Sequence, residues 1–464
     1  MAKKKKKISP ISKTIFFTFL LISIITIGIL FYLKLLPIKY FSIILITYSI
    51  IVFLFSHFLF NKKIKQSTKN FFHILAIILI VIFAIISYYL NNTMQFMDKI
   101  KSKGYQLENY YLIAEDSNQE IKKVGVYQTN TLEDALKKIK ISDTKEFKNI
   151  KTMLSSYLNH QVDALFINEG TLELLKEEEN FHYKIIKKIS IKIKVKLDSK
   201  DVEVTRQPFN IYISGIDIKG DISSVSRSDV NMIMTVNPKS SQILLTSIPR
   251  DYYVRLHGTT GYKDKLTHAG LYGINMSIET IEDLLDVNIN YYIRVNFTTL
   301  IDIVDAIGGI TIYSDKAFTS YTDKSCSYKL GNNTVDGRCA LAFSRERYAY
   351  QEGDRHRIKN QQTVLMAMIH KITSSKTLIT KYTSILNTLS NSFETNMSSD
   401  RIYSLINMQL DSMPNWNIDT YSLDGFNSSN YTYSYSASKL YVMEPDINTI
   451  NTATTKIKEV SEVS

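Results

Sequence analysis

The arginines of this sequence are concentrated in one short stretch. The chain has 45 lysines and 11 arginines, yet four arginines lie within residues 344–362, which read SRERYAYQEGDRHRIKNQQ. Arginine, unlike lysine, presents a planar fork that holds phosphate or carboxylate oxygens through two parallel hydrogen bonds. The stretch therefore predicts a phosphate site built from Arg345, Arg347, Arg355 and Arg357. A solvated helix face of paired Arg and Glu residues is the alternative that this stretch alone leaves open.

Two aspartates could hold a metal ion beside these arginines. Asp217 ends an apolar run in SGID, and Asp229 precedes the next apolar run in SRSD. If both runs are strands, both carboxylates can face one cleft at the strand ends. Such a pair suits Mg²⁺ better than Zn²⁺, because Mg²⁺ commonly takes one or two carboxylates together with substrate phosphate oxygens. A turn aspartate and a strand-edge aspartate without a metal would give the same spacing.

The first hundred residues predict a membrane anchor. Three uncharged runs, at residues 14–33, 40–60 and 71–90, each have about the 20 residues needed to cross a hydrocarbon core. Lysines at residues 3–7 and 62–69 place those two segments in the cytoplasm. Three spans then leave everything after about Asn91 outside the cell.

The charge pattern excludes a nucleic-acid partner. Residues 1–100 contain 13 Lys, no Arg and one Asp, so they account for the whole formal net charge of +12. The remaining residues are neutral overall, whereas binding to nucleic acid depends on a basic surface that neutralises phosphates. The predicted partner of the anchor is the lipid bilayer.

The rest of the chain predicts two α/β domains. Short strands at 124–127 and 163–167, helices at 132–139 and 147–158, and a lysine-alternating strand at 185–195 indicate a small accessory domain. Three apolar strands begin at Asn210, Val230 and Gln242, and helical stretches follow at 280–285, 300–306, 362–372 and 378–389. This order predicts an α/β/α layered domain with a central mixed sheet, in which ligands bind at the strand ends.

The predicted boundaries follow from these patterns. We expect a cytoplasmic tail at 1–13, three transmembrane helices within 14–90, an extracellular accessory domain at 91–205, a catalytic domain at 206–445 and a polar tail at 446–464. Residues 91–100 are expected to form a short connector. The two cysteines, Cys326 and Cys339, lie in the exported part, where a disulfide and two free thiols are both compatible with their spacing.

Five blocks of this sequence resemble, in order and spacing, the LytR-CpsA-Psr family, especially its capsule-type members with three spans and an accessory domain. The blocks are ISGIDIKGDISSVSRSDVNMIMTVN, LLTSIPRDYYV, KDKLTHAGLYG, NYYIRVNF followed by IVDAIGGI, and FSRERYAYQEGDRHRIKNQQ. The resemblance covers residues 208–389. It implies a cell-wall glycopolymer ligase that uses Mg²⁺. Such an enzyme moves a capsular polysaccharide or teichoic-acid-like polymer from a polyprenyl pyrophosphate carrier onto peptidoglycan. The three spans of such an enzyme could also contact polymer-synthesis proteins in the membrane.

The resemblance also implies roles for individual residues. By position, Asp217 and Asp229 match the Mg²⁺ ligands, and Asp354 matches a carboxylate that either orients Arg357 or acts as a base. The residues that match the pyrophosphate site, with Gln361 as a polar contact and Lys265 at its edge, are Arg227, Arg250, Lys265, Arg345, Arg347, Arg357 and Gln361. Of the whole set, Arg227, Arg250 and Asp354 are the expected catalytic residues. His356, Ile358 and Lys359 depart from the usual family motif.

Two other functions fit the same residues. A lipid pyrophosphatase would use the same arginines and Mg²⁺, with water as the acceptor. A membrane-tethered regulator or polymer-binding protein would need no metal, so the paired carboxylates argue against it. The lipid tail needs an apolar channel, for which the Leu, Ile and Phe residues within 266–300 are candidates, although an ordinary packed core explains most of them better.

Overall fold

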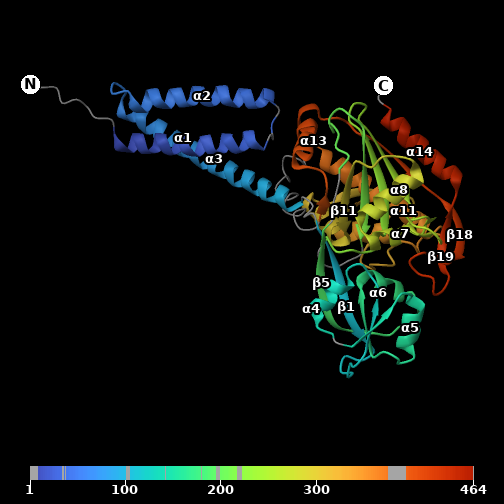
Figure 1. The fold of residues 1–464 in the computed structure, drawn as a ribbon. Helices are drawn as coiled ribbons and strands as arrows, with labels where there is room; N and C mark the ends of the chain where they lie inside the picture. Colours follow the sequence, from blue (N-terminus) through green and yellow to red (C-terminus); the bar gives the residue numbers. More distant parts are fainter. Residues whose placement is uncertain are drawn as a thin grey trace, which may run out of the picture.

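The computed structural model describes residues 9–33, 36, 38–100, 105–141, 143–178, 180–194, 199–216, 222–374 and 393–462. Figure 1 shows three parts: a group of long helices, a small domain and a larger layered domain. The predicted helical stretch at 378–389 lies outside the described residues, and so does Asp217.

The N-terminal part consists of three long apolar helices, α1 (Pro10–Tyr32), α2 (Ile38–Phe60) and α3 (Gln66–Ile100). All three are long and apolar enough to cross a membrane, which confirms the predicted spans. They pack through Phe19, Phe55 and Leu59. The prediction of a connector at 91–100 is wrong, because α3 continues through these residues as one helix.

The accessory domain is a five-stranded sheet in the order β3-β2-β4-β1-β5. β1 is antiparallel to β4 and β5, whereas β2 is parallel to β3 and β4. The predicted strands and helices are present, with apolar clusters on both faces of the sheet. The elements are β1 (Tyr105–Ala114), β2 (Val124–Tyr127), α4 (Leu132–Ile139), β3 (Thr144–Phe147), α5 (Ile150–Leu158), β4 (Ala164–Asn168), α6 (Glu169–Leu175) and β5 (Lys184–Lys194).

The larger domain is built on a six-stranded mixed sheet in the order β16-β11-β6-β7-β8-β17. Its strands are β6 (Phe209–Ile216), β7 (Val230–Asn237), β8 (Gln242–Ile248), β11 (Tyr291–Asn296), β16 (Phe393–Thr395) and β17 (Asn417–Ser422). Smaller pairs are β9 (Tyr253–Val254) with β10 (Asp264–Lys265), β12 (Ile310–Ser314) with β15 (Gly331–Val335), β13 (Phe318–Thr319) with β14 (Ser327–Tyr328), and β18 (Gly425–Asn430) with β19 (Leu440–Pro445).

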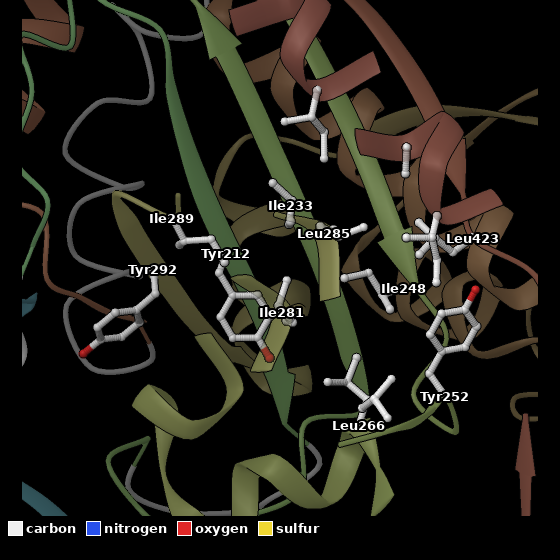
Figure 2. Packing of buried hydrophobic residues seen from close by; sticks show 14 of the residues in the cluster. Tyr212, Ile233, Ile248, Tyr252, Leu266, Ile281, Leu285, Ile289, Tyr292 and Leu423 are labelled. Atoms are coloured by element: carbon white, nitrogen blue, oxygen red, sulfur yellow. The ribbon is translucent and has the colours of Figure 1, made fainter. Parts of the chain in front are cut away.

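Helices cover both faces of this sheet, because alternate strand residues point to opposite sides. Tyr212 and Ile233 pack against α8 (Ile274–Leu285), as Figure 2 shows, whereas Ile213 and Met232 face α11 (Asp354–Thr373) and α13 (Ser399–Ser412). The remaining helices are α7 (Leu266–Ala269), the 3-10 turn η1 (Gly270–Tyr272), α9 (Phe297–Ala306), α10 (Gly337–Arg345) and α14 (Ile447–Ser461). The predicted α/β/α layering is confirmed.

The C-terminal segment differs from its prediction. Residues expected as a polar tail form α14, which packs on the sheet through Ile450, Ala453 and Ile457. This apolar stripe has helical spacing but is interrupted by Asn and Thr residues, which hide it in the sequence. The side chain of Asp446 caps the helix by accepting from the Asn448 N–H.

A disulfide joins Cys326 to Cys339, so the first of the two alternatives for the cysteines holds. Cys326 is buried beneath α10, the helix that ends at Arg345. The disulfide therefore fixes the helix that precedes the arginine-rich stretch.

Candidate functional site

The sheet topology brings the predicted site residues to one edge. β7 is antiparallel to both β6 and β8, so Asp229, just before β7, lies at the same edge as Arg250, which follows β8. β11 is parallel to β6 and ends at this edge as well. The expectation that the strand ends gather these groups is confirmed for Asp229 and Arg250.

Arg250 lies at the centre of a charged network. Its Nη1 donates to Asp229 Oδ1 over 2.8 Å, and its Nε lies 3.3 Å from Asp251 Oδ2. The nearly buried Lys265 pairs with the other oxygen of Asp251, at 3.3 Å. Burial alone would lower the pKa of Arg250, but Asp251, Asp229 and Asp354 raise it above its ordinary value. Arg250 is therefore a permanent cation in a partly buried site.

Asp354 links two further arginines. Arg357 Nη2 lies 2.9 Å from Asp354 Oδ1, and Arg347 Nε lies 3.2 Å from the same oxygen. Burial raises the pKa of Asp354, and the neighbouring Arg347 and Arg250 offset that rise only in part. These contacts give Asp354 the orienting role. Its role as a base stays a prediction.

Arg227 is held from another domain. Its Nη1 donates to Glu177 Oε1 over 2.9 Å, and its Nη2 donates to the carbonyl oxygen of Glu173 in α6. The backbone before it pairs with the accessory sheet, since Leu107 N donates to Ser223 O and Val225 N donates to Leu107 O. The accessory domain therefore sets the position of one predicted catalytic arginine.

Gly270 allows close packing on the other side of the Arg227 segment. A Cβ on Gly270 would lie 2.5 Å from the carbonyl oxygen of Ser226 and 2.9 Å from the Ser228 nitrogen. Only glycine allows this approach of backbone to backbone. The Arg227 segment is thus held between the accessory sheet and the turn that follows Lys265.

Arg345 and Gln361 lie beside an apolar cavity. The Arg345 guanidinium lies 4.8 Å from the centre of the Phe297 ring, and Phe297, Ser344 and Gln361 all line the cavity. The cavity has a volume of about 300 Å³, and Asn296 and Thr299 are the other polar residues in its lining. The rest of the lining comes from the strands β6, β7, β11 and β16 and from the helices α9 and α11: Ile213, Gly215, Val230, Met232, Met234, Ile293, Val295, Leu300, Ile303, Val364, Leu365, Met368, Ile369, Ile372 and Phe393. The sheet edge therefore places cations beside an apolar space.

Arg355 has a different carboxylate partner from Arg347 and Arg357. Its Nε donates to Asp424 Oδ1 over 2.6 Å, and its Nη2 donates to the Gly425 carbonyl. Arg355 ties the start of α11 to the β18–β19 hairpin. The prediction that Arg355 holds phosphate stays a prediction, since the other predicted phosphate arginines also pair with carboxylates.

Glu346 is a structural residue of the site that the sequence analysis missed. It is fully buried, and its carboxylate accepts hydrogen bonds from the Ser320 hydroxyl and from the backbone N–H groups of Tyr321, Arg347, Tyr348 and Ala349. Burial alone would raise the pKa of Glu346, but these donors lower it below its ordinary value. An acidic residue between two arginines was the only signal in the sequence.

Arg294 was also missed. It is buried on β11, and its Nη2 donates to the carbonyl oxygen of Ser224 over 2.8 Å. Nε and Nη1 make no hydrogen bond among the residues that the structure describes, and burial lowers the pKa of Arg294. An arginine within the apolar strand YYIRVN was a usable signal. Asp251, adjacent to Arg250, is among the charged residues that the sequence places at the strand ends, whereas nothing in the sequence indicated Glu177.

The structure describes one of the two predicted metal ligands. Asp229 is placed at the sheet edge, but Asp217 lies outside the described residues. Among the described residues, no group of three or more His, Cys, Asp or Glu could hold a metal ion. Mg²⁺ needs only one or two carboxylates when phosphate oxygens and water complete its shell. The Mg²⁺ site therefore stays a prediction.

Comparisons with known proteins agree with this architecture. The model of the LytR_cpsA_psr family matches residues 171–453. The polyisoprenyl-teichoic acid–peptidoglycan teichoic acid transferase TagU of Bacillus mycoides is 36% identical over 213 residues, which cover 45% of this chain and 68% of that protein. TagU of Bacillus subtilis is 35% identical over 215 residues, with 46% and 68% covered.

A solved structure, protein gbs0355 from Streptococcus agalactiae, is 28% identical and covers 57% of this chain and 92% of its own, with a TM-score of 0.49. The family assignment rests on the sequence comparisons. The family model matches more than half of the chain, and the TagU relatives match it over two thirds of their own length. The chain therefore belongs to the LytR-CpsA-Psr family.

Proposed function

We propose that this protein is a membrane-anchored transferase that moves a glycopolymer from a polyisoprenyl pyrophosphate carrier onto peptidoglycan outside the cell. One observation carries the proposal: arginines converge at one sheet edge beside an apolar cavity, in a chain with three helices long enough to span a membrane. Cations suit a pyrophosphate, and the cavity suits the hydrocarbon chain attached to it. The names of the TagU relatives describe the same pair of substrates.

The arginines would neutralise charge during transfer. A hydroxyl oxygen of peptidoglycan attacks the phosphorus that carries the glycopolymer, the bond from this phosphorus to the bridging oxygen breaks, and polyisoprenyl phosphate leaves. The hydroxyl proton passes to a base or to the leaving phosphate. Positioning and charge neutralisation are the main demands of phosphoryl transfer. Arg250, Arg347 and Arg357 meet them because carboxylates of the same domain hold all three in place.

The cavity would hold the first part of the isoprenyl chain. Gln361 and Ser344 lie at its polar end, and Met368 and Ile372 line it further along α11. Of the Leu, Ile and Phe residues within 266–300 that were candidates for a tail channel, Ile293, Phe297 and Leu300 line this cavity. Leu266, Ile274 and Ile281 belong to the packed core on the other face of the sheet, as the preferred alternative held.

Mg²⁺ remains part of the proposal. Asp217 and Asp229 would hold it, and the ion would neutralise charge on the two phosphates. Asp229 already binds Arg250, so this arginine would share its carboxylate partner with the ion.

The expected polymer is teichoic-acid-like, because the relatives are named for teichoic acid transfer. A capsular polysaccharide is the other candidate polymer. The orientation of the chain, with a cytoplasmic N-terminus and an extracellular catalytic domain, rests on the lysine distribution and belongs to the proposal as well.

The test uses the full chain in lipid nanodiscs with a labelled polyisoprenyl pyrophosphate-linked saccharide and peptidoglycan fragments, with and without Mg²⁺. A phosphodiester product that Arg250→Ala and Asp229→Ala abolish supports the transferase. Free saccharide phosphate without transfer would favour the pyrophosphatase. Binding of the lipid without turnover would instead make the protein a carrier-lipid binding protein or regulator.

A further inference from the structure

The apolar cavity extends away from the charged edge. Along α11 its lining runs from Gln361 to Ile372, twelve residues that span roughly 16 Å at the rise of an α-helix. Phe393, on the edge strand β16, also lines this cavity. The cavity therefore reaches the lateral edge of the sheet, which is formed by the short strand β16.

The membrane helices pack against the catalytic domain at the same side. Leu33, directly after α1, and Leu90 of α3 form a buried apolar cluster with Tyr403 of α13, and Phe393, Ile402 and Ile406 pack against it. We call these six residues the junction. Figure 1 shows α13 as the helix of the larger domain that faces the membrane helices.

The junction lies at one surface of the bilayer. Leu33 ends the first apolar run and Leu90 ends the third, so both stand where these helices leave the hydrocarbon core. The loop between α1 and α2 is on this side, and so is the rest of the chain after α3. The junction therefore joins the outer end of the anchor to the catalytic domain.

We propose that the junction is the route by which an isoprenyl chain passes from the outer leaflet into the cavity. This inference rests on the proposed function, since it concerns the carrier lipid of that reaction. Phe393 carries the argument, because this residue of the junction also lines the cavity. A chain that follows Phe393 stays in contact with apolar groups and never crosses water, which hydrocarbon avoids.

A second pocket supports this direction of entry. It has a volume of about 920 Å³ and lies between the outer ends of α1 and α2 and the side of α13 that carries Ser399, Asp400, Tyr403, Ser404 and Asn407. Leu30, Phe31, Leu33 and Phe41 line it from the membrane helices. None of its lining residues is Lys or Arg, so it offers no site for a phosphate. It leaves room beside the junction for a hydrocarbon chain, while the headgroup remains nearer the arginines.

The experiment compares two substrates on the full chain in nanodiscs. One carries a long isoprenyl chain embedded in the bilayer, and the other carries two isoprene units and is supplied from solution. Ile406→Glu places a charge in the junction without touching the cavity lining. The matched control is Ile447→Glu, because Ile447 is 61% exposed at the start of α14, away from the junction.

Ile406→Glu is expected to lower kcat/KM for the long-chain substrate at least tenfold and to change it less than twofold for the short one. Ile447→Glu should change neither. An equal loss with both substrates would show that the junction only supports the fold, and no loss with either would show that the chain enters elsewhere; both results overturn the proposal. If the unmodified protein turns over neither substrate, the proposed function itself fails.

A second measurement does not depend on activity. A photo-crosslinking phenylalanine analogue at position 403 should capture a labelled polyisoprenyl phosphate in the nanodisc, and an excess of unlabelled polyisoprenyl phosphate should prevent the capture. The same analogue at position 426, where Phe426 is 65% exposed on β18, serves as the control. Equal capture at both positions, or none at 403, would contradict the route.

Discussion

Arg227 and Arg250 are both predicted to hold pyrophosphate, but different parts of the molecule hold them in place. Arg250 is fixed within the catalytic domain by Asp229 and Asp251, whereas Arg227 is fixed by Glu177 and Glu173 of the accessory domain. The sequence of the accessory domain contains no group of residues typical of a catalytic or metal site. The comparison shows that a domain without chemistry of its own can still complete a site by positioning one residue.

The largest effect is expected for Arg250, which is held by residues of its own domain. Arg250→Ala should lower kcat/KM for glycopolymer transfer about 100-fold or more, because it removes a preorganised cation from the developing charge. It also leaves Asp229 and Asp251 without their guanidinium partner. Arg255→Ala is the matched control, since Arg255 contacts only the Gly261 carbonyl of an exposed loop among the described residues. An effect of Arg250→Ala no larger than that of Arg255→Ala would contradict the site.

Substitution of Glu346 tests whether the arginines held within the catalytic domain depend on the loop at residues 347–349, whose backbone donates to the Glu346 carboxylate. Glu346→Gln should lower the free energy of unfolding by about 2–3 kcal/mol at neutral pH, because hydrogen bonds to a buried charge are replaced by weaker ones. The folded-state pKa of Glu346 is depressed, so its contribution is present above the ordinary Glu pKa and is lost as the pH falls through the lower folded value.

The difference in unfolding free energy between the native protein and Glu346→Gln should therefore shrink on acidification, which denaturant titrations of the full chain at several pH values would measure. A difference that stays constant with pH would show that the carboxylate charge does not hold the loop.

The contact of Glu177 with Arg227 should have a smaller effect. Whether KM falls or rises should depend on the residue that replaces Glu177. Glu177→Gln keeps an acceptor for Arg227 but removes a negative charge near the incoming pyrophosphate, so KM should fall about two- to fivefold, which corresponds to an interaction of roughly 0.5–1 kcal/mol. Glu177→Ala removes the acceptor as well and should raise KM, because Arg227 loses its position. Glu133→Gln, at an exposed position on α4, is the control. If Gln and Ala at position 177 change KM in the same direction, positioning and charge are not separate effects.

The smallest effect is expected for a surface pair remote from the site. His257 Nδ1 lies 2.7 Å from Asp283 Oδ2, and this hydrogen bond raises the pKa of His257. The pair should stabilise the fold below about pH 6.5 and lose this contribution as the pH rises through the higher folded pKa. Asp283→Asn should cost less than about 1 kcal/mol at pH 5.5 and almost nothing at pH 9, as measured by thermal unfolding. This pair gives the baseline for an exposed contact, against which Glu177 can be judged.

The sequence predicted what depends on short-range spacing and strand order. Asp229 and Arg250 meet because neighbouring antiparallel strands bring them to one edge, and Asp354 reaches Arg357 because the two are three residues apart on α11. The sequence could not predict the contact of Arg227 with Glu177, since fifty residues and a domain boundary separate them. It also missed α14, because propensity counts its Asn and Thr residues against a helix that tertiary packing stabilises.

The uninterrupted helix α3 has a consequence for where the enzyme can work. Its last ten residues after Leu90 extend roughly 15 Å beyond the apolar run. The junction, through Leu33, Leu90 and Tyr403 among its six residues, packs the catalytic domain directly against the anchor. The arginines are therefore kept at a set height above the bilayer. For the function proposed above, this height means that carrier lipids would reach the arginines by diffusing in the membrane, and that the acceptor would be the wall material nearest to the membrane.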